Sequence, residues 1–271
     1  MTIYYKYRFL IFRRLLQFTA LFLFAGSNWF GWTVLKGNFS SAKLLETVNL
    51  TDPFAVLQIL ATGFQVGADV LISALLVLVF YSLLSGRMFC SWVCPINPVS
   101  DFTRWLRSML GIKRNLLGAT KNFRYWLLGL SLVLSAITGI AAFEAISPIG
   151  FFHRQVVFAA GFGWAVVLMV FFLDLGIVKN GWCGFLCPLG SFYSVVGNIG
   201  LLKVNHKKEK CTLCNKCFQV CPEPQVLGII GKQNGFVKSG ECTNCARCIE
   251  VCDDKALGFS LRINENKKKV K

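Results

Sequence analysis

Two cysteine runs near the end of the chain constrain its fold more than any other feature. Each run has the spacing Cys-x2-Cys-x2-Cys-x3-Cys. In two-cluster ferredoxins, three cysteines of one run hold one 4Fe-4S cubane and the fourth binds the cluster of the other run. The predicted ligands are Cys211, Cys214, Cys217 and Cys252 for cluster 1, and Cys242, Cys245, Cys248 and Cys221 for cluster 2. The runs therefore predict two 4Fe-4S clusters and a role in electron transfer.

Zinc is the alternative for these cysteines, because CxxC pairs also build tetrahedral zinc sites. Such sites normally combine two pairs, or cysteines with histidine. Here a triple followed by a fourth cysteine occurs twice, and no histidine lies between Cys211 and Cys252. The pattern favours iron–sulfur clusters.

The composition indicates a membrane protein, because 55% of the residues are hydrophobic and the mean hydropathy is +0.56. Four apolar segments of about the length of a bilayer span are Leu15–Leu35, Gly63–Ser85, Phe123–Phe143 and Val156–Val178. We therefore expect an α-helical membrane protein with four transmembrane helices and a C-terminal bacterial-type two-cluster ferredoxin domain of the α+β class. The expected domains are residues 1–202 (membrane domain), 203–260 (ferredoxin domain) and 261–271 (basic tail).

The basic residues predict the orientation. Between Arg87 and Arg124 there are seven basic residues and one acidic residue, which the positive-inside rule places in the cytoplasm. The resulting topology is a multi-pass inner-membrane protein with both termini cytoplasmic and all twelve cysteines on the reducing side. The formal charge of +16 does not indicate a nucleic-acid partner, because the basic residues flank apolar segments.

The segment between the first two spans, residues 36–62, is predicted to be an extracytoplasmic loop. Within it, Thr51 or Asp52 is a candidate N-cap for a short helix that begins at Pro53.

Two CxxxCP motifs follow the second and fourth spans, with Cys90 and Cys94 in one and Cys183 and Cys187 in the other. Cysteines four residues apart share one face of a helix. Two such pairs at one membrane surface could converge on a mononuclear iron or a third cluster, which would be an additional iron centre. The alternatives are thiol pairs that switch to disulfides and buried, unreactive cysteines.

Three ionisable residues are further site candidates. Asp174, in the fourth span, is either a proton acceptor or a residue that pairs with a base such as Lys179. Glu144 and His153, beside the short outer loop, are candidates to accept hydrogen bonds and protons from a quinol. The alternative for His153 is an ordinary solvated surface residue.

The order of these features resembles the NapH family, the ferredoxin-type quinol dehydrogenase subunits of periplasmic nitrate reductase systems. The segments that carry the resemblance are Gly37–Ser41, Leu50–Pro53, Phe89–Pro98, Gly181–Pro188 and Cys217–Pro224. They extend over nearly the whole chain, and their combination is more specific than any one motif.

The resemblance implies electron flow from the quinone pool, as menaquinol or ubiquinol, through two cytoplasmic 4Fe-4S clusters to a NapG-like ferredoxin subunit. It also implies that both CxxxCP motifs are needed for function. A NapC-like cytochrome or a cytoplasmic NapF-like ferredoxin is a further candidate partner. The alternative function is an iron–sulfur electron donor for maturation, or for thiol or cofactor reduction, in a respiratory reductase system. A third is a membrane anchor that recruits a soluble ferredoxin.

Overall fold

A computed structural model describes residues 3–112, 115–116, 118, 120–159 and 161–262, with side chains from residue 7 onward. The chain forms two compact units. The unit that we call the cysteine-rich unit draws on residues 1–16, 80–93 and 193–271, and the helical unit on residues 17–79 and 94–192. Residues 80–93, which precede the first predicted ferredoxin residue by more than a hundred positions, thus pack with the cysteine runs. Most of the predicted basic tail, 261–271, lies outside the described residues.

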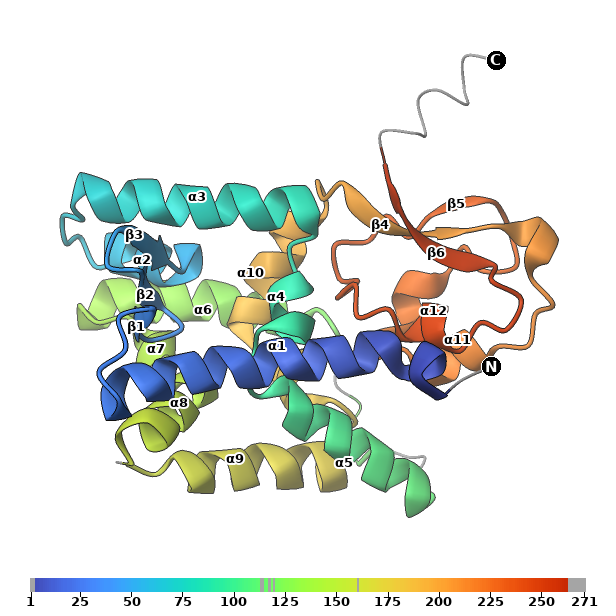
Figure 1. Ribbon diagram of the computed structural model, residues 1–271, viewed down its shortest axis with the longest axis horizontal. Coiled ribbons are helices and arrows are strands. Elements are labelled where there is room, and N and C mark those ends of the chain that lie inside the picture. The colour runs from blue at the N-terminus through green and yellow to red at the C-terminus, as the bar shows by residue number, and fades with distance from the viewer. Residues whose placement is uncertain (1–2, 113–114, 117, 119, 160, 263–271) are drawn as a thin grey trace. The chain divides into compact units, whose positions relative to one another are not determined.

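The cysteine-rich unit contains a three-stranded antiparallel sheet of order β5-β4-β6 (Figure 1). Its central strand is β4 (Leu202–His206), which pairs with β5 (Gly235–Phe236) and β6 (Leu257–Leu261). The other elements are α4 (Met88–Trp92), η3 (Lys208–Lys210), α11 (Lys216–Val220), η4 (Pro224–Leu227) and α12 (Arg247–Glu250). Apolar side chains of the sheet and of η4 share one core with Cys217, Cys221 and Cys248. The α+β character expected for this domain is therefore present.

The helical unit contains a second antiparallel sheet, β1 (Leu35–Gly37), β2 (Ser41–Leu44) and β3 (Val48–Thr51), in sequence order. The sequence did not predict these strands. α2 (Pro53–Ala61) follows directly, and the Asp52 carboxylate accepts a hydrogen bond from the Phe54 N–H at 3.4 Å. The prediction of a capped helix that begins at Pro53 is confirmed.

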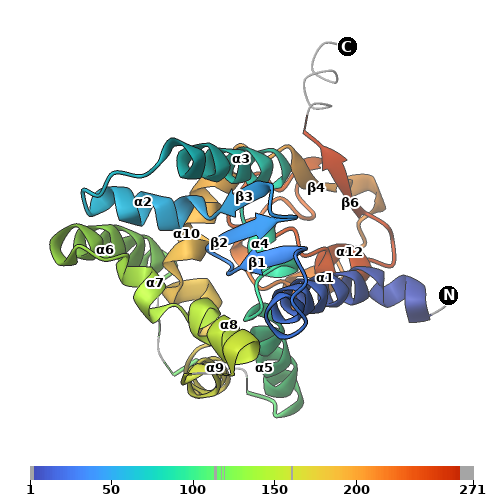
Figure 2. The same ribbon diagram turned by 60° about the vertical axis from the view of Figure 1, so that its left-hand side comes forward.

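The remaining elements are helical. They are α5 (Asn97–Met109), α6 (Phe123–Thr138), α7 (Ala142–Ile146), α8 (Pro148–Phe158), α9 (Gly163–Phe172), and the two π-helical turns η1 (Leu173–Ile177) and η2 (Trp182–Leu186). The short helices α7 and α8 join α6 to α9 (Figure 2). Three helices, α1 (Ile3–Trp29), α3 (Ala68–Leu84) and α10 (Pro188–Gly197), contribute residues to both units.

Among the described residues, one helical segment, Tyr7–Trp29 in α1, is long and apolar enough to cross a membrane. Three shorter apolar helices, Ala68–Leu84, Phe123–Thr138 and Gly163–Ile177, lie where the other spans were predicted. All four predicted segments extend beyond these helices. α1 ends at Trp29 and not at Leu35, and α3 begins at Ala68 and not at Gly63. α6 ends at Thr138, because Gly139 adopts φ 71°, and Val156 belongs to α8, which ends before the left-handed Ala159.

Candidate functional site

A cavity in the cysteine-rich unit is lined by all four cysteines predicted to bind cluster 2, Cys221, Cys242, Cys245 and Cys248. Three of them come from the second run and one from the end of the first run. Apolar side chains of β4 and η4, including Val204 and Leu227, and the loop residues Thr243 and Asn244 are also part of its wall. Four cysteine sulfurs around one cavity are the donor set that a 4Fe-4S cubane requires, so these residues fit the group.

The ligands predicted for cluster 1 are also drawn together. The Asp253 carboxylate accepts from Lys216 at 2.6 Å, and the Asp254 carboxylate accepts from the Thr212 hydroxyl at 2.6 Å. Because each of these four residues lies within two positions of a cysteine, the contacts hold Cys252 beside the loop from Cys211 to Cys217. Cys214 on this loop is exposed, whereas Cys245 and Cys248 are buried. Cluster 1 would therefore be the more accessible of the two.

The two cysteine loops repeat the same backbone conformation. Leu213 and Asn244, which precede the second cysteine of each run, have φ values of 59° and 47°. Asn215 and Ala246, which follow that cysteine, have φ values of 56° and 63°. Alternation of left-handed and ordinary residues turns successive N–H groups toward one side and forms a concave anion-binding nest, as at many iron–sulfur sites. The loops are thus shaped for an anionic cluster.

The helix that carries Cys90 packs on the loop of cluster 2. The Ser91 hydroxyl donates to the Thr243 carbonyl oxygen at 2.7 Å, and the Trp92 indole N–H donates to the Asn244 carbonyl oxygen at 3.1 Å. The first CxxxCP motif therefore begins in direct contact with the cluster 2 loop, although the two are about 150 residues apart in sequence.

A buried ion pair strengthens this contact. Arg87 donates to the Glu223 carboxylate at 3.0 Å and to the Glu241 carbonyl oxygen at 3.0 Å. Glu223 lies two residues after Cys221, and Glu241 directly precedes Cys242. Arg87 thus links the segment before Cys90 to both parts of the chain that supply cluster 2. Sequence reasoning missed this role, because an arginine after an apolar segment reads as a cytoplasmic flank.

The second CxxxCP motif lies in the helical unit on the π-helical turn η2. The Cys183 sulfur is 3.5 Å from the Ser100 hydroxyl, which donates to the Asp174 carboxylate at 2.6 Å. Burial raises the pKa of the Cys183 thiol well above its usual range, and the nearby Asp174, Cys94 and Cys187 raise it further. Cys183 is therefore a neutral thiol at pH 7. The sequence predicted Asp174 and the cysteines but not Ser100, which has no distinguishing local motif.

Two buried arginines hold the π-helical turns in place. Arg107 donates to the carbonyl oxygens of Asp174 and Leu175 at 3.2 and 2.7 Å, and Arg124 donates to the Gly184 carbonyl oxygen at 3.4 Å. A π-helical turn leaves carbonyl groups without their usual helical partners, and a cation near a helical C-terminus is favourable. These two members of the basic segment therefore have a structural role in addition to any effect on topology.

Within the described parts of the chain, no three or more His, Cys, Asp or Glu side chains form a group that could hold a metal ion. This finding concerns a single metal ion, whose ligands must all lie close to one point. The four cysteines of a 4Fe-4S cubane lie farther apart, because each binds a different iron atom. Of the CxxxCP cysteines, Cys94, Cys183 and Cys187 lie in the helical unit and Cys90 in the cysteine-rich unit.

Glu144 and His153 both lie next to the turn that precedes β2. The Ser40 hydroxyl donates to the Glu144 carboxylate at 2.6 Å, and the neighbouring Phe39 ring packs against the His153 ring at 5.6 Å. His153 is almost completely buried, with Phe24 and Phe158 also against its ring. Its Nε2 atom has no hydrogen-bond partner among the described residues. The alternative that His153 is an ordinary solvated surface residue is therefore wrong, because aromatic side chains enclose it.

Burial affects the protonation of both residues. It lowers the pKa of His153 to about 4, with a smaller contribution from Arg154. It raises the pKa of Glu144, although the Ser40 hydrogen bond and Arg154 oppose this shift. His153 is therefore neutral at pH 7, and Glu144 is a stronger proton acceptor than an exposed glutamate.

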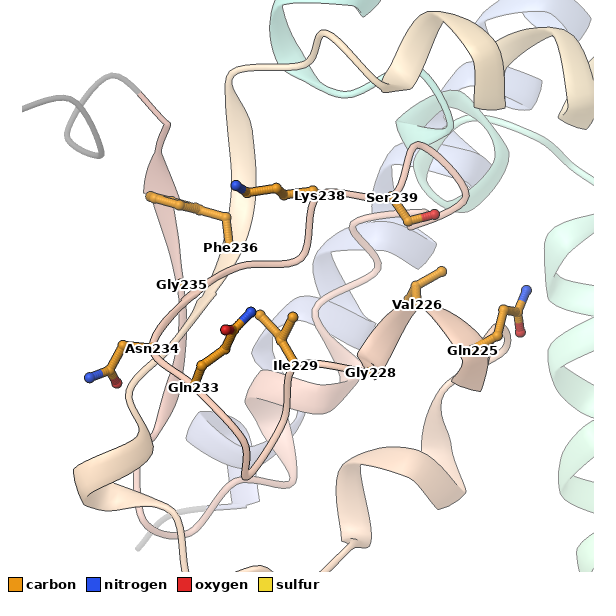
Figure 3. Close-up of a pocket in the computed structure, with 10 residues that line it drawn as sticks. All are labelled: Gln225, Val226, Gly228, Ile229, Gln233, Asn234, Gly235, Phe236, Lys238 and Ser239. Atoms are coloured by element: carbon orange, nitrogen blue, oxygen red, sulfur yellow. The ribbon is translucent and has the colours of Figure 1, made fainter. Parts of the chain in front are cut away.

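A second cavity in the cysteine-rich unit, of about 440 Å³, lies beside β5 (Figure 3). Its lining includes the polar residues Gln225, Gln233, Asn234, Lys238 and Ser239. No cysteine lines it, so it is separate from the cavity predicted for cluster 2.

Comparison with known proteins agrees with this site. The profile of a family described as a 4Fe-4S dicluster domain matches residues 203–253. That of a family described as a 4Fe-4S binding domain matches residues 66–113 and 157–207, which include both CxxxCP motifs. Two clusters of cysteines on a small α+β domain thus define a ferredoxin-type iron–sulfur protein.

Several curated proteins are similar over most of their length. The chain is 43% identical to the ferredoxin-type protein NapH of Escherichia coli over 82% of this chain and 77% of the relative. It is 40% identical to NapH of Haemophilus influenzae over 83% and 78%. It is also 40% identical to the methylamine utilization ferredoxin-type protein MauN of Paracoccus denitrificans over 79% and 76%. The chain belongs to the NapH family of ferredoxin-type proteins. No solved structure matches it.

Proposed function

We propose that this protein oxidises menaquinol or ubiquinol in the inner membrane and passes the electrons through its 4Fe-4S clusters to a NapG-like ferredoxin subunit, which feeds periplasmic nitrate reduction. A NapC-like cytochrome or a NapF-like ferredoxin is a further candidate partner. The clusters, when bound, supply one-electron acceptors for a two-electron donor. The residues of the chain have to bind the quinol, take up its protons and hold the cluster loops.

Exposed apolar side chains support a membrane location with four spans. Large hydrophobic residues that contact little protein cover α1, α3, α6 and α9. Examples are Phe22, Ile72, Ile137 and Met169. In water such surfaces would be unfavourable, whereas lipid tails would cover them. The 17 residues of α3 extend about 26 Å, at the lower limit for a span.

The observation that carries the quinol assignment is the enclosed His153. A buried nitrogen atom without a partner costs stability, and a ligand hydroxyl would satisfy it. Neutral His153 can accept one hydrogen bond from a quinol, while the rings of Phe24, Phe39 and Phe158 offer faces for the quinol ring. Glu144, with its raised pKa, is the second acceptor and the proton acceptor.

Asp174 and the CxxxCP cysteines are assigned to the transfer that follows. The path Cys183, Ser100, Asp174 can carry a proton, because each step is a hydrogen bond. Cys90 is placed next to the cluster 2 loop by α4. We also propose an additional iron centre at the CxxxCP cysteines. The family match across both motifs favours it.

Anaerobic mixing of the purified protein with menaquinol, followed by EPR of the clusters, tests the proposal. We expect cluster reduction in the wild type and a loss of at least about tenfold in its rate in His153→Ala and Glu144→Gln. The matched control is Glu46→Gln, whose side chain is exposed and pairs with Lys36 in the same unit. Absence of reduction, with and without the partner subunit, would exclude the quinol dehydrogenase function.

A role in maturation is the second candidate, because relatives named for two different systems, NapH and MauN, are similar to this chain over most of its length. Both are called ferredoxin-type proteins, but the name of MauN refers to methylamine utilization. In this function the clusters would donate electrons for the reduction of a cofactor or of thiols, in a nitrate reductase system or in methylamine utilization. The two functions can be distinguished by the cofactor content of nitrate reductase isolated from cells that lack this protein.

If the reductase contains all its cofactors but receives no electrons from quinol, the dehydrogenase function is supported. If the reductase lacks its cofactors, the maturation function is supported.

A further inference from the structure

The contact between α4 and the cluster 2 loop involves donors on the helix and carbonyl groups on the loop. Ser91 binds the Thr243 carbonyl oxygen at 2.7 Å, and Trp92 binds the Asn244 carbonyl oxygen at 3.1 Å. Ser91 and Trp92 are both buried, as is Asn244. These hydrogen bonds are therefore shielded from competition with water and fix two consecutive peptide groups of the loop.

Peptide geometry carries the effect of these bonds toward the sulfur atoms. The carbonyl group of Thr243 and the N–H group of Asn244 belong to one planar trans peptide, so they point in opposite directions. The Cys242 sulfur lies 3.4 Å from the side-chain Oδ1 of the same Asn244, and a backbone hydrogen bond from Asn244 opposes the rise in the pKa of the Cys242 thiol that burial causes. Ser91 therefore holds, from behind, the peptide group that donates to a predicted ligand of cluster 2. Trp92 holds the next peptide group, which ends at Cys245.

Hydrogen bonds to ligand sulfurs are one of the main determinants of cluster reduction potential. A donor withdraws electron density from the sulfur and stabilises the reduced, more negative cluster. A peptide group that is free to rotate donates less well on average. The rigidity of the loop thus affects the potential of cluster 2.

We propose that Ser91 and Trp92, inside the first CxxxCP motif, are positioning residues that raise the reduction potential of cluster 2 by fixing two consecutive peptide groups of the loop that carries its ligands Cys242 and Cys245. The inference rests on the cluster assignment within the proposed function but not on quinol oxidation. No bond forms or breaks, and each cluster takes up one electron in the measurement. The motif would then have a role besides that of its cysteines, because its intervening residues tune a cluster bound elsewhere in the sequence.

A redox titration of the full-length, cluster-loaded protein with mediators, monitored by EPR, tests this directly. The variants are Ser91→Ala, Trp92→Phe and Ser91→Thr, and Cys221→Ser and Cys252→Ser assign the two cluster signals. We expect a more negative potential of cluster 2 in Ser91→Ala and Trp92→Phe. We expect the equilibrium constant for electron transfer from cluster 1 to cluster 2 to fall about tenfold. For a one-electron couple, this corresponds to a decrease of about 59 mV in the reduction potential of cluster 2. Ser91→Thr, which keeps the hydroxyl, should restore the wild-type potential.

Two internal references make the result decisive. Cluster 1 in the same molecule should keep its potential, since α4 holds the other loop. Ser85→Ala is the matched variant, because Ser85 is buried in the same unit and its hydroxyl has no partner among the described residues. An unchanged cluster 2 potential in both test variants, equal shifts of both clusters, or loss of cluster 2 from both variants would each overturn the proposal. Because mediators replace the quinol, a failure of quinol oxidation would leave this result unaffected.

Discussion

Arg87 and Glu223 form an ion pair of 3.0 Å in which the two side chains are only 2% and 3% exposed. Arg87 precedes the first CxxxCP motif, and Glu223 follows the last cysteine of the first ferredoxin run. Charges so deeply buried are costly unless they are paired. The pair therefore makes the fold of the cysteine-rich unit depend on residues from two distant parts of the sequence.

Removal of Arg87 should destabilise the cysteine-rich unit strongly. Arg87→Ala leaves the Glu223 carboxylate buried without its cation, for which we expect a loss of about 3 to 5 kcal/mol. The double variant Arg87→Met, Glu223→Met should lose less, because it removes both charges. Denaturant unfolding, followed by the cluster absorbance, measures both. Equal losses in the two variants would contradict this explanation.

Gly86 should tolerate no side chain. A Cβ atom there would lie 2.0 Å from the Tyr193 carbonyl oxygen and 2.4 Å from the Gly197 nitrogen, so the backbones would have to separate. We expect Gly86→Ala to cost more than about 2 kcal/mol, as for overpacked cores. Gly258→Ala is the control, since a Cβ atom at Gly258 meets no atom within 4 Å. Thermal unfolding of the two variants provides the comparison.

The predicted exchange of the fourth ligand between the two cysteine runs can be tested by iron content. Cys221→Ser should remove cluster 2 although Cys221 belongs to the first run, and Cys252→Ser should remove cluster 1. Each variant should retain about four of about eight iron atoms. EPR identifies the remaining cluster by comparison with Cys242→Ser, which should resemble Cys221→Ser. If Cys221→Ser instead resembles Cys211→Ser, each run binds its own cluster. More than about eight irons in the wild type would support the additional centre.

His153 should make stability depend on pH. Its pKa is about 4 in the folded protein and about 6.5 in the unfolded chain, so the unfolded chain binds the proton more readily. The stability contributed by neutral His153 is complete above pH 6.5 and is lost as the pH falls toward 4. His153→Phe should lack this part of the decline. Unfolding temperatures of the two proteins between pH 4 and 7 check the difference, and parallel curves would show that His153 does not titrate in this range.

The sequence predicted those features in which chemistry imposes a spacing. The eight cysteines and the dicluster domain could be recognised because a cubane requires a triple and a fourth ligand. Asp52 and Pro53 likewise predicted the start of α2, since capping is a local property. These predictions depend on residues within a few positions of one another.

Other features depend on partners that no local pattern specifies. By sequence alone, three arginines are indistinguishable from arginines that flank a membrane span: Arg87, Arg107 and Arg124. Each is in fact buried against backbone or carboxylate groups that lie far along the chain. Ser100 is a site residue because α5 places its hydroxyl between Asp174 and Cys183, which the local sequence does not indicate. The spans were predicted too long because hydropathy continues through the turns at Gly139 and Ala159, where the backbone reverses.

The left-handed residues of the two cysteine loops have a consequence for the cell. Leu213, Asn215, Asn244 and Ala246 each adopt a conformation that costs a non-glycine residue about 1 kcal/mol or more. A bound anionic cluster offsets this cost through the N–H groups that it gathers. Without the cluster, we expect the loops to leave this conformation. The carbonyl groups of Thr243 and Asn244, which bind α4, would then move with the loop. The amount of intact protein should therefore follow the iron and sulfide supply, so that starved cells remove it by proteolysis.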